Sequence, residues 1–484
     1  MAQQLFFSRD SKIYMKFGNK VWDLPVLDGF SFSQATNSSE ITLAEMEGSG
    51  GVSRRGRRQF NDSLAPAEWS FSTYVRPFKA ATGAGTGTAD NVALTHAVEE
   101  ALWAMFLGGK TYSDTHQVFQ DAVPVTVAAT AIVKSDQYVI TAAGTTDFTS
   151  FGAADSVVGT SFISTGSGAA GSGSGTVQQV LNVPTLTSAT FNAALSNRAT
   201  MGTADIFFVL GNANRKVYKL KDCVVNEAAL DFDIDGIATI NWSGMSSEII
   251  DMTGSTHTGG TNPPAFNAVT ADGTTILAGD VVLDTADAHR LTIITDPTSS
   301  GTADVTSGIY EGTLSTTNFI RNRLTQLTVI PTAGTSYIGS LESGGYNITL
   351  TGGNITMSNN VTFITPEELG VVNTAIGHVT GTRSVSGSMS CYLSKDTTTT
   401  TSSADLWEDL KSITNIVSNS FELNFKIGGA TAGTSRLEVK MPTCHLEIPT
   451  HSIEDVISVE TSFNALPSTI DGTNEATITY FSKQ

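Results

Sequence analysis

Short runs of alternating apolar and polar residues recur along most of this chain. Within 421–427 the apolar residues are Phe421, Leu423, Phe425 and Ile427, a strict period of two that is typical of a strand with one buried face. The same alternation predicts strands at 13–17, 21–24, 30–33, 69–75, 205–210, 217–220, 229–242, 318–330, 346–351, 361–364, 376–393, 436–442 and 456–463. We therefore expect a mainly β fold.

One of these strands follows a basic segment in the stretch 53–79, SRRGRRQFNDSLAPAEWSFSTYVRPFK. The segment carries four arginines: Arg54, Arg55, Arg57 and Arg58. After a turn that contains Pro66, Trp69 and Phe71 share one face with Thr73, and Ser70, Ser72 and Tyr74 share the other. This alternation predicts a strand with one apolar face and one polar face.

Two segments have a helical period instead. In 90–109 the apolar residues form one broad face, Asp90 is the expected N-cap, and Gly108 with Gly109 ends the helix; His96 is expected on its surface. The second helix is expected in SADLWEDLKSI, with Ser402 or Ser403 as its cap.

Polar segments divide the predicted elements. The span 36–53 is Gly-rich and has no sustained period, so we expect a long loop there. The span 117–198 is nearly free of charge and ends in a Gly/Ser tract, which predicts an inserted small β module with strands at 138–140 and 161–163. A second inserted β segment is expected at 259–307.

The remaining segments contain an internal duplication. The strand that ends at Tyr74, the helix with Trp103, the strand 205–210 and the strand through Cys223 have counterparts later in the chain. In the same order, the counterparts are the strand that ends at Tyr392, the helix with Trp407, the strand 421–427 and the strand through Cys444. The closing strand IDGIATINWSG also matches IEDVISVETSF. The predicted halves are 1–116 with 199–258, and 308–484. Such tandem β units offer edge strands, and head-to-tail pairing of edges can close a ring around a lumen.

Composition narrows the functional classes. The chain has 484 residues, a formal net charge of −19, and only 15% charged residues. This acidic balance disfavours nucleic-acid binding by phosphate neutralisation. We expect no membrane span, no secretion signal in MAQQLFFSRDSKIYMKF, and, with three widely spaced cysteines, no disulfide framework.

The candidate sites are few, and each has a structural alternative. The arginine cluster suits an inter-subunit or inter-ring contact better than a nucleic-acid patch or a targeting signal. Asp231, Asp233 and Asp235 spell the start of a calcium loop, but Trp242 stands where the bidentate Glu is needed, so we expect an acidic strand face. Cys444, with His445 and His451 close by, lacks a second cluster to complete a zinc site.

We therefore expect no metal, no cofactor and no catalytic site; the sequence contains no G-x-S-x-G, H-E-x-x-H or P-loop motif. GTGTAD before the first predicted helix is interpreted as a linker. Cys223 and Cys444 occupy matching positions of the duplication, and we expect both to be small buried core residues.

Several separated segments resemble a tail tube protein of the duplicated branch found in long, non-contractile-tailed bacteriophages. They are RRQFNDSLAPAEWSFSTYVRPFK, KVYKLKDCVVNEAALDFDIDGIATINWSG, VTFITPEELGVVNTAIGHVTGTRSVSGSMSCYL and LEIPTHSIEDVISVETSFNALPS. The resemblance covers about 1–116, 199–258 and 308–484. It implies two tandem β-sandwich and barrel units with one helix each, plus the inserted modules.

The resemblance also implies a function and partners. Three chains would form a ring, and stacked rings would form a tube that conducts DNA into the host. Its partners would be other copies of the chain, a tape measure protein, tail terminator and distal tail proteins, and double-stranded DNA that passes without specific binding. It would be assembled in the host cytoplasm and located in the virion tail. The alternative is a β-rich adhesin that binds carbohydrate through the Thr/Gly-rich insertions.

Overall fold

The structure is a computed structural model. The residues that it describes are 5–17, 20–42, 57–79, 95–113, 118–121, 126–134, 137–179, 201–211, 216–253, 256–257, 281–284, 291–296, 301–304, 319–331, 345–366, 368, 374–395, 402–411, 420–429, 435–453, 455–467 and 474–481. Strands dominate these residues, as the alternating pattern predicted.

The first half of the chain pairs its strands in the order β2–β1–β15–β16–β17–β6–β3, and β18 also pairs with β16. Every pair is antiparallel. The bounds are β1 (Lys12–Phe17), β2 (Lys20–Leu24), β3 (Ser31–Ser33), β6 (Ala67–Tyr74), β15 (Ala204–Leu210), β16 (Lys216–Asp233), β17 (Thr239–Ser246) and β18 (Glu248–Asp251).

The second half repeats this order strand for strand as β24–β23–β29–β30–β32–β28–β25, and β33 pairs with β30 as β18 does with β16. The short strand β31 also pairs with β32. The bounds are β23 (Gln326–Pro331), β24 (Tyr346–Ile348), β25 (Leu350–Ser358), β28 (Ser384–Tyr392), β29 (Phe421–Ile427), β30 (Arg436–Leu446), β31 (Thr450–Ser452), β32 (Ser458–Ala465) and β33 (Thr477–Phe481).

The two halves also share a break in strand register at equivalent positions. The β15–β16 ladder has a register shift next to the pair Ala204 and Cys223, and the β29–β30 ladder has one next to Phe421 and Cys444. In both places the buried thiol donates to a carbonyl three residues earlier, that of Leu220 or Met441. A bulge increases the local twist of a strand, so each cysteine lies where its long strand passes from one sheet layer to the other.

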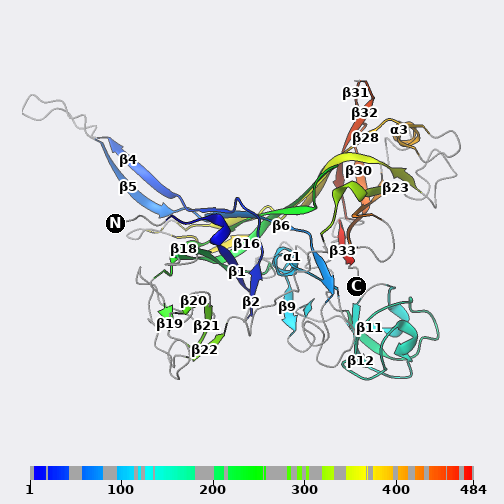
Figure 1. The fold of residues 1–484 in the computed structure, drawn as a ribbon, viewed down its shortest axis with the longest axis horizontal. Coiled ribbons are helices and arrows are strands. Elements are labelled where there is room, and N and C mark those ends of the chain that lie inside the picture. The colour runs from blue at the N-terminus through cyan, green and yellow to red at the C-terminus, as the bar shows by residue number, and fades with distance from the viewer. Residues whose placement is uncertain are drawn as a thin grey trace, which may run out of the picture.

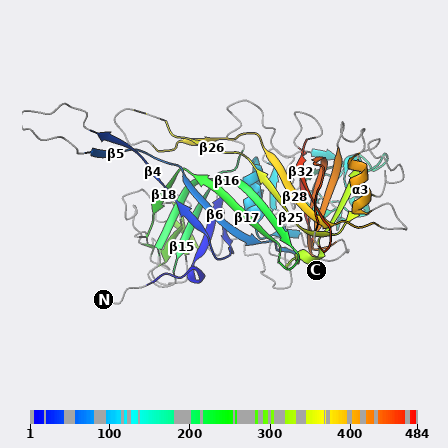
Figure 2. The same ribbon diagram turned by 90° about the horizontal axis from the view of Figure 1, so that it is seen from above.

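The two halves are joined by β16 and β25. Residues 227–233 of β16 pair with 352–358 of β25, so the inner strands of both halves form one continuous sheet. Figure 2 shows β6, β17, β16, β25 and β28 side by side in this sheet. One hydrophobic core lies behind it and takes side chains from both halves, including Trp103, Trp242 and Phe425.

The first helix is shorter than predicted. α1 spans Glu100–Leu107, and all eight of its residues are buried. Residues 95–97, predicted as helix, form β8 (Thr95–Ala97), which pairs with β7 (Pro77–Lys79), so His96 lies on a strand opposite Phe78. Strand pairing overrides the helical period here; Asp90, the predicted cap, lies outside the described residues.

The second helix begins where predicted. α3 spans Ser403–Leu410, and Ser402 and Asp405 form a reciprocal capping box at its start. Asp409 is buried and accepts a hydrogen bond of 2.9 Å from the Tyr346 hydroxyl. The helix therefore presents one charged side to solvent and docks the other through a polar contact.

The long loop predicted over 36–53 is wrong for its first residues. β4 (Thr36–Thr42) pairs with β5 (Arg57–Leu64) in a hairpin that extends beyond the sheet (Figure 2). Both faces of β5 are largely exposed, so no apolar period marks the strand in the sequence. Polar cross-strand contacts such as Asn37 to Ser63, 2.9 Å, hold it instead. The second half has a shorter counterpart, β26 (Thr362–Ile364) paired with β27 (Gly377–Val379).

The first predicted insertion contains the two strands expected there. β12 (Gln137–Ala142) and β13 (Ser161–Ile163) form a four-stranded sheet with β11 (Thr126–Ala128) and β14 (Thr176–Gln179). This sheet has its own core around Tyr138, Phe148 and Phe162. By contrast, Phe119 on β10 (Val118–Asp121), which pairs with β9 (Lys110–Ser113), stacks on Trp22 of the main core at 5.2 Å.

The second predicted insertion, 259–307, contains β20 (Val281–Asp284), β21 (Leu291–Asp296) and β22 (Gly301–Asp304). These strands form a separate small sheet with β19 (Thr256–His257), which lies just before the predicted boundary. The short 3-10 helices among the described residues are η1 (Ser8–Asp10), η2 (Ala129–Ala131), η3 (Phe148–Phe151) and η6 (Asn322–Leu324).

The boundaries of the two halves and of the two insertions, as predicted from the sequence, stay a prediction.

Candidate functional site: the open face of the sheet

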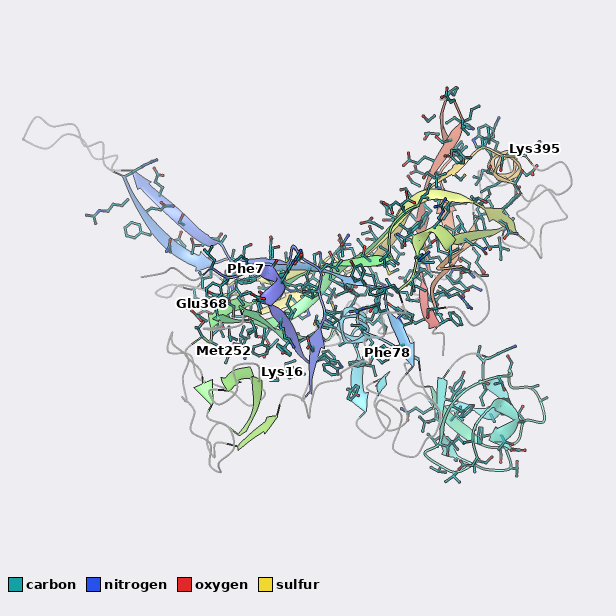
Figure 3. All side chains as sticks on the ribbon, in the orientation of Figure 1. Phe7, Lys16, Phe78, Met252, Glu368 and Lys395 are labelled. Carbon is teal, nitrogen blue, oxygen red and sulfur yellow. The ribbon has the colours of Figure 1, made fainter. Side chains whose placement is uncertain are left out.

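The continuous sheet has one face that no other described element covers, and we call it the open face. Figure 1 shows α1, β9 and the two small inserted sheets on the opposite side of the sheet. Figure 3 places Lys16 and Phe78 on that covered side as well. The alternation of exposed and buried residues along each strand then decides which side chains lie on the open face.

Direct cross-strand pairing puts polar residues of seven strands on the open face. One row across the sheet, for example, runs Ser72, Asn241, Ala229, Thr356, Ser386 and Asn464. The polar members of the face are Ser31, Ser33, Glu68, Ser70, Ser72, Tyr74, Glu227, Asp231, Asp233, Thr239, Asn241, Ser243, Asn354, Thr356, Ser386, Ser388, Ser390, Glu460, Ser462 and Asn464. Hydroxyl and amide groups therefore dominate the face.

Neighbouring strands share hydrogen bonds across this face. The Ser31 and Ser70 hydroxyls lie 2.8 Å apart, and Ser72 donates to the Asn241 side chain at 2.6 Å. Asn241 in turn donates to Asp231 at 2.9 Å. These lateral contacts hold short side chains in place, so the face is polar and also ordered.

The charge of the open face has one sign. Its carboxylates are Glu68, Glu227, Asp231, Asp233 and Glu460, and the described strand positions of this face include no lysine or arginine. A surface with several like charges and no counterion side chains repels polyanions.

The predicted acidic strand is part of this face. Asp231 and Asp233 lie on β16 and are exposed, whereas Asp235 lies in the following turn, 3.8 Å from exposed Arg323. Because the three carboxylates follow an extended strand into a turn, they do not converge on one point. Among the described residues, no group of three or more His, Cys, Asp or Glu side chains is placed to hold a metal ion.

The arginine cluster is only partly described. Arg57 and Arg58 lie on β5 and are exposed, and Arg57 makes an ion pair of 3.3 Å with Glu40 on β4. Arg54 and Arg55 lie outside the described residues. The structure thus places the two described arginines on the projecting hairpin, away from the open face.

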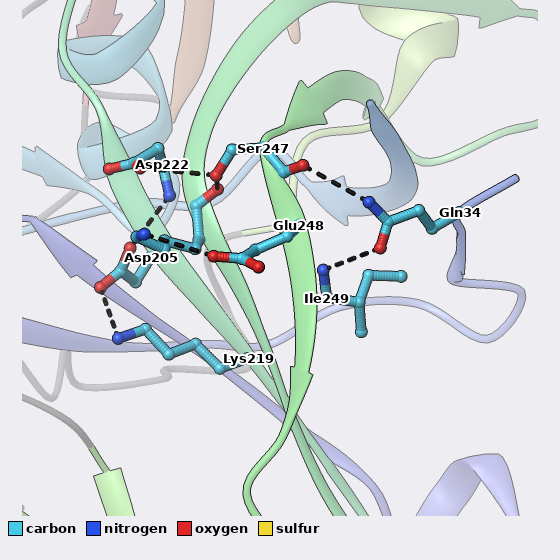
Figure 4. Close-up of polar contacts among 8 residues, drawn as sticks. Gln34, Asp205, Lys219, Asp222, Ser247, Glu248 and Ile249 are labelled. Carbon is cyan, nitrogen blue, oxygen red and sulfur yellow. Dashed lines mark hydrogen bonds and ion pairs between the residues drawn. The ribbon is translucent and has the colours of Figure 1, made fainter. Parts of the chain in front are cut away.

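A polar network fixes the base of this hairpin (Figure 4). Gln34, between β3 and β4, accepts a hydrogen bond from the Ile249 amide at 3.1 Å and donates to the Ser247 carbonyl at 3.4 Å. On the far side of Ser247, Asp205 accepts from the Asp222 amide and pairs with buried Lys219 at 3.2 Å. The network ties the start of the hairpin to β18 and to the bend of β16.

The remaining candidates are structural. Cys223, Cys391 and Cys444 are buried and unpaired, and burial raises the pKa of Cys391 to about 11 and that of Cys444 to about 12. His445 and His451 are exposed on strands. Thiols held in their neutral form are poor metal ligands and poor nucleophiles.

Sequence reasoning missed one buried polar cluster. Glu99, fully buried before α1, accepts a hydrogen bond of 2.6 Å from the Tyr480 hydroxyl, which accepts one of 2.7 Å from the Trp103 indole. Burial raises the pKa of Glu99 to about 7, an effect that the Tyr480 hydrogen bond opposes. Because Tyr480 is near the far end of the chain, no local pattern could reveal this contact, which connects the second half to the first.

The arrangement defines a mainly β protein that has a duplicated sheet with an acidic open face, projecting hairpins and, among the described strands, free sheet edges. No helix among the described residues is long and apolar enough to cross a membrane. No family model matches the chain. The chain is 24% identical over 465 residues to tail tube protein pb6 of Escherichia phage T5, covering 95% of this chain and 71% of that protein. The similarity supports a siphophage tail tube protein, as the resemblance predicted, and gives no support to a carbohydrate-binding adhesin.

Proposed function

We propose that the chain is the structural subunit of a bacteriophage tail tube that closes into homotrimeric rings, stacks, and conducts DNA during ejection. The observation that carries the proposal is the continuous inner sheet, which pairs one half with the other and, among the described strands, leaves complementary edges at its two ends. No catalytic role is assigned to any residue. The tube would form in the host cytoplasm and become part of the virion tail.

The pairing inside the chain supplies the template for ring closure. β25 is bonded on one side to β28 and on the other to β16. In the internal repeat, β3 of the first half corresponds to β25 of the second half. Among the described strands, however, β3 is hydrogen-bonded only to β6. Its second edge is therefore open to a strand from another copy.

The matching edge lies at the other end of the sheet. The end of β30 and the short β31 correspond to the part of β16 that binds β25, and in the described residues they are bonded there only to β32. Pairing this edge with β3 of the next chain would reproduce the β16–β25 contact. Such a head-to-tail contact closes a ring when the rotation permits, and three chains of two halves give pseudo-sixfold symmetry.

In such a ring the open face lines the lumen, because the other face is covered by the core. DNA carries one negative charge per about 1.7 Å of axis, so a lumen with carboxylates and without cations repels it and prevents adhesion during passage. Hydroxyl and amide groups keep the wall hydrated. Contacts with a tape measure protein and with tail terminator and distal tail proteins belong to the same proposal.

The test is assembly of the purified protein, followed by negative-stain electron microscopy and analytical ultracentrifugation. We expect rings and tubes at high protein concentration. A strictly monomeric species under these conditions would refute the proposal. As a second readout, tubes should not retain double-stranded DNA at physiological ionic strength.

A deletion tests whether the inserted sheet stands outside the tube wall. Residues 126–179 have their own core, and Thr126 pairs directly with Gln178, so a short Gly/Ser linker can replace the segment. We expect the deletion variant to form tubes of normal width at the wall. The deletion leaves Phe119 and β10 in place, because that side chain belongs to the main core.

A further inference from the structure

Two turns at one end of the sheet expose large apolar side chains. The first turn, 234–238, joins β16 to β17. The second joins β31 to β32, and its described residues are 453 and 455–457; we call the pair the rim turns. Their exposed apolar residues are Ile234 (41% exposed), Ile237 (40%), Ile453 (80%) and Val456 (57%). Isolated exposed apolar residues are ordinary, but an arrangement that recurs at equivalent places calls for a cause.

The recurrence follows the internal duplication. Aligning IDGIATINWSG with IEDVISVETSF puts Ile234 opposite Ile453 and Ile237 opposite Val456. In the adjoining strands the two copies differ strongly, since Trp242 corresponds to Thr461 and Gly244 to Phe463. Two inward-facing positions have therefore changed in volume, although the buried pair Ile240 and Val459 stays apolar, while two solvent-exposed positions have kept their apolar character.

The first rim turn lies beside an open pocket of about 250 Å³. The pocket is lined by Ile234, Asp233, Asn322 and Tyr392, among others, and Leu324 is exposed nearby on η6. Within the described residues, the buried Oδ1 of Asn322 has no hydrogen-bond partner. The rim therefore offers a recess with an unused acceptor next to an apolar surface.

The opposite end of the same strands carries the two hairpins. Ser33 pairs with Glu68 where β3 continues into the β4–β5 hairpin, whereas Tyr74, at the other end of β6, pairs with Thr239 beside the first rim turn. The hairpin end also exposes apolar side chains, namely Phe60 on β5, Ile364 on β26, and Ile376 and Val379 at β27. The molecule thus has two apolar poles that face in opposite directions.

The two poles also offer individual charges of opposite sign. Asp233, Asp235 and Asp455 are exposed at the rim turns, and Arg323 lies near one of them. The hairpin presents Arg57 and Arg58 beside two exposed carboxylates, Glu40 and Asp62. Glu40 pairs with Arg57 and Asp62 accepts a hydrogen bond from Ser39, and among the described residues Arg58 has no carboxylate partner. Opposite charges on facing poles favour one orientation of stacking.

We infer that the rim turns are the surface that binds the hairpin pole of a second copy of this chain in the next ring. This inference rests on the proposed function and names the residues that join one ring to the next. A contact between two different surfaces of the same molecule does not close on itself along the axis, so it propagates rings into a tube. The duplication presents the rim contact twice per chain.

The test uses the full chain with one lysine in each rim turn, Ile234→Lys with Ile453→Lys. Both sites are exposed, so the fold tolerates the change, while the lysines face arginines across the stacking contact. We expect rings without tubes, with the protein concentration needed for tubes raised at least about tenfold. Rings of this variant keep an intact hairpin pole, so adding them to wild-type rings should cap growing tubes and shorten them.

Val158→Lys is the matched control, because Val158 is comparably exposed but lies in the inserted sheet. It should leave tube length unchanged. A second pair tests the charges from the other pole: Arg58→Glu should weaken stacking, and adding Asp233→Arg should restore part of it.

Tubes of wild-type length from the rim variant would overturn the inference, as would the loss of rings from that variant while the control still forms them. If the wild-type chain itself makes neither rings nor tubes, the proposed function fails first. Wild-type tubes together with unaffected rim variants would overturn only the stacking assignment.

Discussion

The two halves of this chain pair their strands identically but fill them differently. In the first half Trp69 on β6 faces Gly244 on β17, and in the second half the corresponding pair is Gly387 on β28 and Phe463 on β32. The aromatic residue and the glycine have exchanged strands. The same volume is filled from opposite sides, so at this position the repeat preserves the pairing of the strands but not the individual side chains.

The helices of the two halves differ in how deeply they are buried. α1 is buried on all sides and lies against Trp242, with the Trp103 and Trp242 rings 4.9 Å apart. α3 keeps an exposed side, where Lys411 lies over Trp407 at 4.2 Å. The half that carries the larger insertion also covers its helix, and Phe106 of that helix accepts a hydrogen bond from Asn359 of the other half. The first half therefore acts as the central anchor of the chain.

The aromatic–glycine exchange can be broken at the glycine. A Cβ on Gly387 would overlap the Asn354 carbonyl and the Phe463 ring, and one on Gly244 would overlap the Val224 carbonyl and Trp69. Gly387→Ala should therefore destabilise the fold by about 3 kcal/mol or more, measured by urea denaturation. Gly387→Trp with Phe463→Gly copies the first half and should be more stable than Gly387→Trp alone.

Gly166→Ala is the control for this series, because nothing lies within 4 Å of the added atom. Equal stabilities of Gly387→Ala and Gly166→Ala would show that the exchange has no steric basis. If the double variant Gly387→Trp, Phe463→Gly were no more stable than Gly387→Trp alone, the second half could not accommodate the side-chain arrangement of the first half.

The Glu99 cluster makes stability depend on pH. Its folded pKa of about 7 exceeds the ordinary value of 4.5 because of burial, so the folded state holds this proton more tightly than the unfolded chain. Stability should therefore fall as pH rises from about 4.5 to about 7, by roughly 3 kcal/mol from this group. Glu99→Gln should remove that part of the pH dependence and stabilise the protein at pH 8.

Chemical denaturation of wild type and Glu99→Gln between pH 4.5 and 8 gives the free energy of unfolding of each protein at each pH. The difference between the two isolates Glu99, because the contributions of groups that titrate in both proteins cancel. The groups around Glu99 are Arg76, Glu100 and Tyr480. Parallel pH profiles of wild type and Glu99→Gln would contradict a shifted Glu99.

These contrasts explain how far the sequence could predict the fold. The period of two located β6 and β29, because each buries one face, and the Ser402 cap located α3. β5 escaped because neither of its faces is buried, and β8 because its pairing with β7 outweighs a helical period. Local patterns report burial, so elements that are stabilised mainly by distant partners do not appear in them.

The candidate site followed the same rule. Asp231 and Asp233 could be assigned to an exposed strand face from alternation alone, whereas the extent of that face depends on which strands pair. The continuity of β16 with β25, and the contact of Glu99 with Tyr480, join residues more than a hundred positions apart. No spacing motif encodes either contact.

The helix starts give a smaller contrast. α3 has a capping box at Ser402, while the residue before α1, Glu99, makes no side-chain cap. Ser402→Ala should cost about 1 kcal/mol, measured as a lower midpoint in urea. Ser402→Thr should retain most of the stability, since its hydroxyl can cap the helix and also donate to the Asp405 carboxylate. If Ser402→Ala were neutral, burial and the Asp409 contact with Tyr346 would be sufficient to hold α3.

The hairpins give the last contrast, with the smallest effect on the isolated chain. Arg57 and Arg58 on β5 correspond, by the repeat, to uncharged Ala375 and Ile376 beside and within the second hairpin. The ion pair of Arg57 with Glu40 is exposed, so Arg57→Ala with Arg58→Ala should change the unfolding free energy by less than about 0.5 kcal/mol. Tube assembly should weaken instead, and its dependence on salt concentration should become shallower, because screening acts on the lost charges. Light scattering of assembly at low and high salt measures both changes, with thermal melts of the unassembled protein as the control. An unchanged salt dependence would mean that the arginines do not contribute to assembly, and a large loss of thermal stability would assign them to the fold of the hairpin.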